Sequence, residues 1–498
     1  MPDKSVAGWR SAVPEPAPLD EQARRVDAWV ACLAAACVGL CYLGGAYVWD
    51  DVPLIAQRLA LLDVSGILSL WTGSVTETGP GSAYYRPVSM TVLAGLGRLG
   101  PLPIHLLALS LHAASTYVLV RLCSGLRSPL LAGVVFAVHP LVGEVLGWSS
   151  ALPDALAVFL GLLSVYLGRR TPLLGFVLLV LGFWSKETAV VVAALVVAGL
   201  GGTRRLWLPW LAAVVVGLSG RILAGVGGAP VGEKNLGLIP DAMGWALGGM
   251  IWPLPLHVIR DVLVAPDSIV MLGWVLIVVL GVLARRSRAA WAGFALMVAA
   301  HAVAMPVVLD GYLLGVRYSY PALVGFSLWL AAVVSWRPRF WVVLAALSAA
   351  MLLHGNDRER WTSNLALFDH VEEAAHNSGL AWHLYAMSNL EASQYREAGL
   401  AFERVLASNK PFPGDETLAL VAWVSAGEHM RALAAAESGP QDGLTAAHLA
   451  WWARAAWGAG DKAQARSLLS KLKGPDGYDG PHWVTAFADT VFGEGSSP

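Results

Sequence analysis

Residues 28–51 read AWVACLAAACVGLCYLGGAYVWDD, an apolar run that ends in two adjacent aspartates. The apolar part is long enough to cross about 30 Å of hydrocarbon as a helix. Comparable apolar runs recur along the chain at Leu173–Trp184, Trp207–Leu223, Ile269–Ala284, Trp291–Leu309 and Val316–Trp336. The sequence therefore predicts an all-α fold built on a polytopic transmembrane helical bundle.

The composition agrees with a membrane protein. Hydrophobic residues make up 56% of the 498 residues and charged residues only 14%, whereas a typical soluble domain is about 25% charged. The net charge is −1 and no basic patch alternates with aromatic residues, so nucleic-acid binding is not expected. The four cysteines have no CxxC spacing and are expected to be small apolar residues of the helices.

Three regions follow from the pattern. Residues 1–27 are polar and lack a signal-cleavage pattern, so we expect a cytoplasmic N-terminal tail and an uncleaved first helix. Residues 28–355 contain about 12–14 spanning or re-entrant segments, with a first extracytoplasmic loop at 49–86. Residues 356–498 are amphipathic and charged, which predicts a water-soluble domain.

Arginine clusters predict the orientation, because short cytoplasmic loops are rich in Lys and Arg. These clusters lie at Arg24-Arg25, Arg169-Arg170, Arg204-Arg205, Arg285–Arg288 and Arg337–Arg339. They leave Asp50-Asp51 and the C-terminal domain outside the cytoplasm. Arg121 and Arg127 fit this orientation only if one of the two segments before them, Pro87–Leu99 or Ile104–Leu122, is short or re-entrant; otherwise they break the rule.

The C-terminal region contains a repeat. Ala398, Ala432 and Ala465 align at intervals of 34 and 33 residues, and Gly427 and Gly460 each precede the aligned alanine by five residues. This is the tetratricopeptide period, in which paired helices pack through small residues. Trp382, Tyr385, Phe402 and Pro411 also match that pattern in the first unit. The alternative is an arbitrary helical bundle.

The acid pair Asp50-Asp51 follows the first spanning helix in the run AYVWDDVPLIAQRL. Acids at a helix end are often ordinary interface residues. Here they begin a loop of about 35 residues that contains an amphipathic stretch, Val52–Trp71, and a Gly-rich segment, Val75–Tyr85. Long ordered loops are usually functional, which favours a site.

Two arginines stand at predicted helix starts, in Tyr84-Tyr85-Arg86-Pro87 and in Arg317-Tyr318-Ser319-Tyr320-Pro321. Each could extend to lipid headgroups or bind a phosphate with its guanidinium group. Both readings stay open from the sequence.

Further charges lie within apolar surroundings. His139, Glu144 and Asp154 fall within 16 residues, and Lys186-Glu187 separates two apolar helices. An ion at mid-bilayer costs roughly 2.5–3.5 kcal/mol on insertion scales, so such residues are functional candidates. The alternatives are a hydrogen bond between His139 and Glu144, and a Lys186-Glu187 pair that neutralises itself.

With these clusters in this order, the chain resembles the transmembrane and tetratricopeptide-repeat O-mannosyltransferase-like proteins of the GT-C glycosyltransferase superfamily. The matching segments are WDD (49–51), YYRP (84–87), HPLVGEVLGWSSALPDA (139–155), SKE (185–187), RYSYP (317–321) and WTSNLALFDH (361–370). The chain departs from the family pattern at Leu152-Pro153, where an arginine is usual before the aspartate, and at Val316, where a glutamate is usual.

The resemblance implies an inverting transfer of a sugar, mannose in that family, from a polyprenyl-phosphate donor to a hydroxyl acceptor such as protein Ser or Thr. It implies that Asp51 or Asp50 is the general base and that the other orients the acceptor. The substrate-binding residues that it implies are Tyr85, Arg86, His139, Glu144, Asp154, Lys186, Glu187, Arg317 and Tyr318.

No cofactor is required by this reading, although Asp50 and Asp51 would also suit Mg²⁺ or Mn²⁺. The expected partners are a lipid-linked donor, a protein or glycan acceptor, and a protein bound by the repeats. We expect a multi-pass integral protein in a membrane of the bacterial inner or endoplasmic-reticulum type. Its repeat domain is expected on the extracytoplasmic side. Two other classes remain: a transporter of a lipid-linked substrate, and a non-catalytic scaffold.

Overall fold

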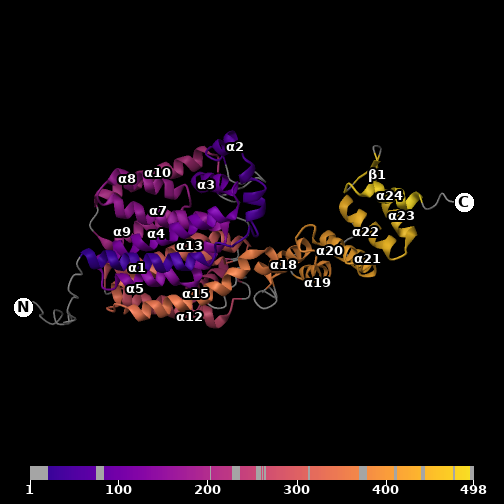
Figure 1. Cartoon of the computed structure of the whole chain (residues 1–498). Helices are drawn as coiled ribbons and strands as arrows, with labels where there is room; N and C mark the ends of the chain where they lie inside the picture. The colour runs from indigo at the N-terminus through magenta and orange to yellow at the C-terminus, as the bar shows by residue number, and fades with distance from the viewer. Residues whose placement is uncertain are drawn as a thin grey trace, which may run out of the picture. The chain divides into compact units, whose positions relative to one another are not determined.

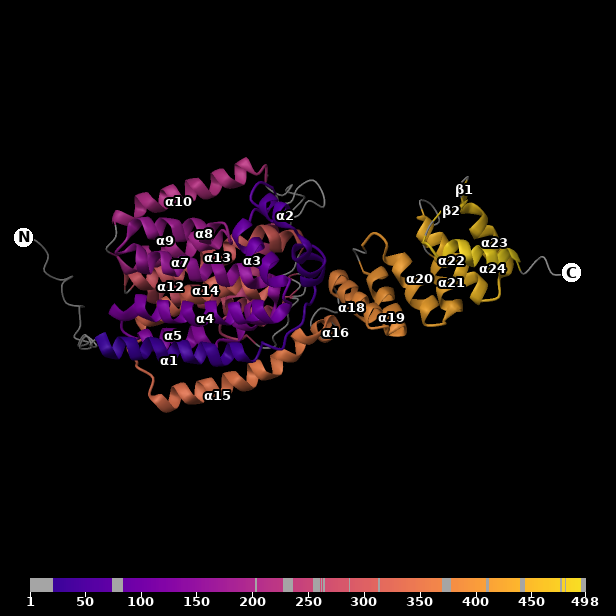
Figure 2. The same cartoon turned by 45° about the horizontal axis from the view of Figure 1, so that its top comes forward.

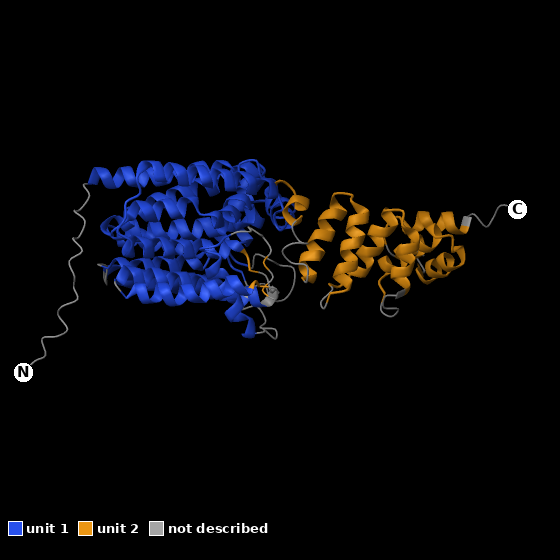
Figure 3. Ribbon diagram, turned by 90° about the horizontal axis from the view of Figure 1, so that it is seen from below, with its two compact units in different colours: residues 1–256, 267–310, 316–361 blue, residues 257–266, 311–315, 362–498 orange. Residues whose placement is uncertain are grey.

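The computed structural model describes residues 21–73, 84–201, 204–226, 236–253, 260, 262, 265–285, 287–311, 314–369, 378–408, 412–438, 444–474, 477–479 and 481–493. The chain forms two compact units (Figure 3). Unit 1 comprises residues 1–256, 267–310 and 316–361, and unit 2 comprises residues 257–266, 311–315 and 362–498.

Unit 1 is a bundle of helices, many of which lie alongside one another (Figures 1 and 2). Its helices are α1 (Glu21–Leu40), α2 (Val64–Ser69), α3 (Pro87–Gly97), α4 (Pro101–Leu122), α5 (Pro129–Val138), α6 (Gly143–Gly147), α7 (Leu152–Gly168), α8 (Pro172–Phe183), α9 (Thr188–Leu200), α10 (Arg204–Leu223), α11 (Ile239–Gly248), α12 (Asp267–Ala284), α13 (Arg288–Gly311), α14 (Ser319–Val333) and α15 (Phe340–Asp357). The predicted all-α class is confirmed.

Six helices of the described chain are long and apolar enough to cross a membrane, or seven if the bent pair Pro129–Val138 and Pro140–Gly147 forms one span. Four further apolar helices, among them α3, α8 and α9, are shorter. The predicted 12–14 segments thus include elements too short to cross as single helices. These findings are consistent with a multi-pass membrane protein.

Exposed apolar side chains cover the outer helices. Leu208 on α10, Met271 on α12 and Leu352 on α15 are all exposed, and α10 and α15 lie on opposite sides of unit 1 (Figure 2). In water such surfaces would be costly. In a bilayer they would face lipid, as the hydropathy pattern predicts.

Charged side chains from α4 and from the loop before α15 pair with acids of α1 near its N-terminal end. Arg121 at the end of α4 pairs with Glu21 at 2.6 Å, and Arg337 pairs with Asp27 at 2.7 Å. Arg121 therefore lies at the same end of the bundle as the start of α1. We call this the N-terminal end of the bundle, and the end carrying residues 46–73 the loop end.

Helix α3 explains how Arg121 reaches the N-terminal end. The amide of Val88 at its start donates to the carbonyl of Trp184 at 3.3 Å, and the Trp184 ring contacts Trp71 of the first loop. Its last residue, Gly97, accepts a hydrogen bond from Tyr47. Both ends of α3 thus lie at the loop end, and 11 residues span only about 16 Å. Of the two segments, only α4 is long enough to cross a membrane, which agrees with the alternative in which one of them is short.

Unit 2 consists of helical pairs and a two-residue strand ladder, β1 (Lys473–Gly474) with β2 (Gly477–Tyr478). Its helices are α16 (Asn364–Phe368), α18 (Gly379–Glu391), α19 (Tyr395–Leu406), α20 (Asp415–Ser425), α21 (His429–Ser438), α22 (Ala446–Gly458), α23 (Lys462–Lys471) and α24 (Val484–Gly493). The boundary with unit 1 follows Trp361 rather than residue 355, because α15 continues to Asp357.

The repeat is visible in the backbone. The three aligned alanines, Ala398, Ala432 and Ala465, are fully buried. Gly427 and Gly460 follow α20 and α22 with φ of 76° and 91°, the left-handed conformation that commonly ends a helix. Ser393 occupies the equivalent place after α18 with φ of 60°. Of the residues that suggested the first repeat, Pro411 lies outside the described residues.

Candidate functional site

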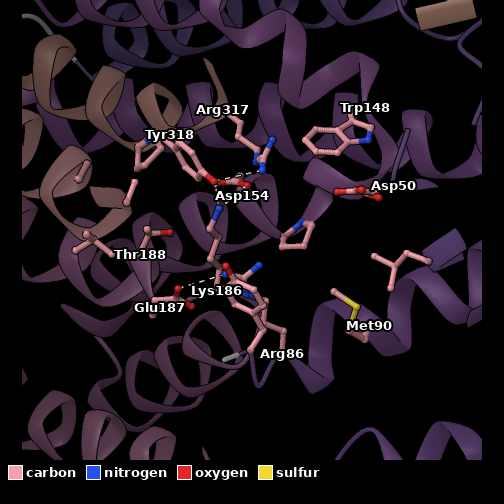
Figure 4. A pocket seen from close by; sticks show the side chains of 18 of the residues that line it. Asp50, Arg86, Met90, Trp148, Asp154, Lys186, Glu187, Thr188, Arg317 and Tyr318 are labelled. Atoms are coloured by element: carbon pink, nitrogen blue, oxygen red, sulfur yellow. Dashed lines mark hydrogen bonds and ion pairs between the residues drawn. The ribbon is translucent and has the colours of Figure 1, made fainter. Parts of the chain in front are cut away.

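A cavity of about 570 Å³ opens in unit 1 (Figure 4). Its lining combines charged, aromatic and apolar side chains. The lining residues are Asp50, Pro53, Leu54, Arg58, Tyr84, Arg86, Met90, Trp148, Ser150, Pro153, Asp154, Lys186, Glu187, Thr188, Ala300, Val303, Ala304, Arg317, Tyr318 and Pro321. The first loop and five helices contribute, so segments far apart in the sequence meet here.

Several lining residues sit at helix starts. Arg86, Glu187 and Tyr318 are the N-cap residues of α3, α9 and α14, and Asp154 lies in the first turn of α7. The positive ends of four helix dipoles therefore meet the cavity wall. Unpaired amides and the dipole at a helix start favour an anion.

Each of three cations at the cavity pairs with a carboxylate. The pairs are Arg86 with Glu187 at 3.3 Å, Lys186 with Asp154 at 2.6 Å, and Arg317 with Glu144 at 2.9 Å. Figure 4 shows Lys186, Asp154 and Arg317 close together in the cavity wall. Although burial raises the pKa of Glu187, the charges of Arg86 and Lys186 lower it to about 2.

These partners differ from the alternatives that the sequence left open. Lys186 donates to both carboxylate oxygens of Asp154, at 2.6 and 2.8 Å, rather than pairing with its neighbour Glu187. The alternative in which Lys186 and Glu187 form an ion pair with each other is therefore wrong. The side chains of Lys186 and Asp154 are 7% and 3% exposed. Such a buried pair is stable only while both members are present.

The expected neighbours His139 and Glu144 also have separate partners. Nε2 of His139 is 2.8 Å from the carbonyl of Met250, and His139 does not line the cavity. Nη1 of Arg317 donates to Oε1 of Glu144, while the guanidinium lies 4.3 Å from the centre of the Trp148 ring. The alternative of a hydrogen bond between His139 and Glu144 is therefore wrong. Glu144 affects the cavity only through its ion pair with Arg317.

The two adjacent aspartates have different surroundings. Asp50 lines the cavity (Figure 4). Although Asp50 is exposed, surrounding protein atoms partly desolvate its carboxylate and raise its pKa, and the charge of Arg317 opposes this shift. Asp51 is fully buried. Its Oδ1 accepts from the amide of Ser150 at 2.7 Å and from the hydroxyl of Ser150 at 2.6 Å, and Oδ2 accepts from the amide of Val48.

Backbone strain occurs beside this acid pair. Trp49 has φ of 51°, and the described chain has only one other non-glycine residue with positive φ, Ser393. A bulky residue in this conformation costs roughly 1–3 kcal/mol and persists where its surroundings enforce it. The Trp49 ring stacks on Trp148 with 5.1 Å between ring centres. This stacking and the anchored Asp51 together direct Asp50 to the cavity.

A buried hydrogen-bonded network supports the segment that carries Glu144 and Trp148. The hydroxyl of Tyr42 lies 2.6 Å from Nδ1 of His354 and donates to Asp357 at 2.9 Å. Nε1 of Trp361 donates to the same Asp357 oxygen.

Two glycines of this segment make room for the network. A side chain at Gly143 would meet the Tyr42 hydroxyl, and one at Gly147 would meet the Trp361 ring. The network thus fixes α6, and with it Glu144, against the end of α15.

Several lining residues were not singled out from the sequence. Tyr84 lines the cavity, whereas the predicted Tyr85 lies outside it and donates its hydroxyl to the carbonyl of Trp71 at 2.9 Å. Trp148, Ser150 and Arg58 also line it. No local pattern singled out Arg58, because it lies between a π-helical turn at Val52–Ala56 and a short turn at Leu59–Leu61 rather than in a regular α-helix.

No group of three or more His, Cys, Asp or Glu side chains within the described ranges is arranged to hold a metal ion. Both carboxylate oxygens of Asp51 already accept hydrogen bonds from Ser150 and Val48. The acid pair therefore does not present two free carboxylates to one ion. Metal dependence stays an open prediction.

Comparison with known proteins gives no relative: no protein-family model, no curated protein and no solved structure matches this chain. The functional argument therefore rests on the site itself.

Proposed function

We propose that the chain is an integral membrane glycosyltransferase that moves a sugar from a polyprenyl-phosphate donor to a hydroxyl acceptor. The observation that carries this proposal is the composition of one cavity. It places a single unanchored carboxylate, Asp50, in the same chamber as Arg86, Lys186 and Arg317. A general base and a set of phosphate-binding cations are the two requirements of inverting sugar transfer.

The reaction follows from these positions. Asp50 takes the proton of the acceptor hydroxyl as its oxygen attacks the anomeric carbon of the sugar. The bond between that carbon and the phosphate oxygen breaks, and the electron pair leaves with the lipid phosphate. Arg86, Lys186, Arg317 and the helix starts around the cavity stabilise the charge that develops on this leaving group.

Asp51 has a positioning role in this proposal. Its carboxylate is occupied by Ser150 and Val48, so it is not available to the acceptor. It ties the strained turn at Trp49 to the segment that precedes α7. This assigns the base to Asp50 rather than to either aspartate.

The finer classification belongs to the same proposal. The order of the motifs supports a GT-C type of bundle, and the repeated turns at Ser393, Gly427 and Gly460 support tetratricopeptide repeats in unit 2. Paired helices of this kind form extended surfaces for polypeptides. We propose a protein acceptor or partner for this surface, on the extracytoplasmic side of a bacterial inner or endoplasmic-reticulum type of membrane.

The test is donor consumption by the full-length protein in lipid nanodiscs. Polyprenyl-phosphate sugars labelled in different sugars would be offered with Ser- and Thr-containing peptides. We expect one donor to be consumed with release of polyprenyl phosphate and labelling of the peptide. Movement of an intact donor across vesicles without cleavage would identify a transporter, and inertness toward every donor would favour a scaffold; either result contradicts the proposal.

A further inference from the structure

We propose that Arg58 binds the phosphate of the lipid-linked donor and of the polyprenyl phosphate left after transfer. The inference rests on the proposed function and deepens it, because it names a binding residue that neither the motifs nor the ion pairs single out. It follows from the placement of Arg58 and from the charge balance of the cavity.

The placement is fixed by the helical segment after the acid pair. Residues Val52–Ala56 form a π-helical turn, closed by the amide of Gln57 donating to the carbonyl of Val52 at 2.9 Å. On one side of this segment Ile55 and Leu59 are fully buried, and Ile55 lies where a side chain at Gly97 of α3 would be.

The other side of the same segment faces the cavity. Asp50, Leu54 and Arg58 follow one another at intervals of four residues, and all three line it. Two short turns, Val52–Ala56 and Leu59–Leu61, give the segment its shape. The packing of Ile55 and Leu59 therefore holds Arg58 on the face that carries the proposed base.

Charge balance separates Arg58 from the other cations. The charges of Arg86, Lys186 and Arg317 are already offset by carboxylates at 2.6–3.3 Å. Among the described residues that line the cavity, Arg58 is the one cation for which no hydrogen bond or ion pair is found. The remaining charges are the negative Asp50 and the positive Arg58.

An incoming phosphate would meet these cations differently. At Arg86, Lys186 and Arg317 it competes with a carboxylate that is already bound. At Arg58 it gains a charged hydrogen-bond partner without that competition, and a guanidinium group can bind two phosphate oxygens at once. Arg58 is thus the cavity's uncommitted phosphate ligand.

The test measures binding rather than turnover. Full-length protein in nanodiscs of neutral lipid would be titrated with labelled polyprenyl phosphate and, separately, with inorganic phosphate. We compare Arg58→Ala and Arg58→Lys with the control Arg98→Ala, an exposed arginine nearby that donates to the carbonyl of Leu62 and does not line the cavity. Thermal unfolding of each variant checks the fold.

We expect Arg58→Ala to weaken polyprenyl-phosphate binding about tenfold or more, the effect of losing a hydrogen bond to a charged group. Arg58→Lys should lie between wild type and Arg58→Ala, and Arg98→Ala should match wild type. We expect inorganic phosphate to bind more weakly than polyprenyl phosphate. If the two probes bind equally and Arg58→Ala weakens both by the same factor, the protein recognises the phosphate group alone.

Two results would overturn the inference. If wild type binds polyprenyl phosphate and Arg58→Ala binds it equally, Arg58 is not the ligand, while the proposed transferase stands. If wild type binds neither probe, the inference fails. The donor-consumption assay then decides separately whether the transferase proposal fails with it.

Discussion

The two ends of the membrane bundle both carry ion pairs, but the pairs are built differently. At the N-terminal end, each pair has one half-exposed member: Glu21 is 54% exposed and Arg121 13%, while Arg337 is 52% exposed and Asp27 3%. At the loop end, Lys186 and Asp154 are both buried and border a cavity. Solvent at one member weakens an ion pair, whereas a pair with both members buried is costly to assemble and persists where structure or function requires it.

The exposure of the ion pairs therefore distinguishes charges at the surface of the bundle from charges that line its cavity. The orientation predicted from the arginine clusters would place the N-terminal end at the cytoplasmic surface, where its charges would face water and lipid headgroups. Charges at the loop end are arranged around an internal space. Sequence alone records both as charges in apolar surroundings, and burial distinguishes them.

The largest expected effect comes from breaking the buried pair. Lys186→Met leaves the carboxylate of Asp154 buried without its cation, which should cost about 3–5 kcal/mol of unfolding free energy. Thermal unfolding of the purified protein in detergent measures this. The double variant Lys186→Met/Asp154→Leu should recover most of the stability, and a double variant no more stable than Lys186→Met would show that charge burial is not the cause.

The matched change at the N-terminal end should be milder. Arg337→Met removes a cation whose side chain is 52% exposed, but its partner Asp27 is 3% exposed. Leaving one buried carboxylate without a partner should cost about 1–3 kcal/mol, less than the loss in Lys186→Met. Equal losses in Arg337→Met and Lys186→Met would remove the contrast between the two ends.

A smaller effect should appear as a pH dependence at Asp51. Burial raises the pKa of Asp51 to about 7, although hydrogen bonds from Ser150 and Val48 oppose this. A carboxyl group with a raised pKa contributes stability below its unfolded-state pKa, and that contribution is lost as the pH rises through about 7. Wild type should therefore lose stability relative to Asp51→Asn between pH 5 and pH 8.

The measurement is the difference in melting temperature between Asp51→Asn and wild type at the two pH values. It should be more positive at pH 8 than at pH 5. Asp63→Asn is the control, because hydrogen bonds from Gly66 and Ser65 lower the pKa of the exposed Asp63, and its difference should not change over this range. A pH-independent difference for Asp51→Asn would contradict the raised pKa.

The sequence predicted the all-helical class, the acid pair that leads into the cavity, and most of the charged residues that line it. Apolar run length predicts spanning helices because the bilayer sets a length, and isolated charges such as Asp154 and Lys186 stand out against such runs. The repeat was predictable because its period is regular. The fully buried Ala398, Ala432 and Ala465 agree with that alignment.

Partner choice was not predictable. Asp154 pairs with Lys186 and Glu144 with Arg317 because four helix starts converge, and no local pattern records that convergence. The different surroundings of Asp50 and Asp51 depend on Ser150, a hundred residues away in the chain. Arg58 was overlooked because its proposed role depends on which side of its segment is packed, and Ile55 and Leu59 decide this.

The central claim is that Asp50 is the base of a sugar transfer in this cavity, and Asp50→Asn tests it most directly. The measurement is the rate of sugar transfer from the consumed donor, with Glu21→Gln from the N-terminal end as the control. We predict that Asp50→Asn folds and binds polyprenyl phosphate but transfers at least about a hundredfold more slowly, while Glu21→Gln equals wild type. A rate for Asp50→Asn within about twofold of wild type would contradict the account.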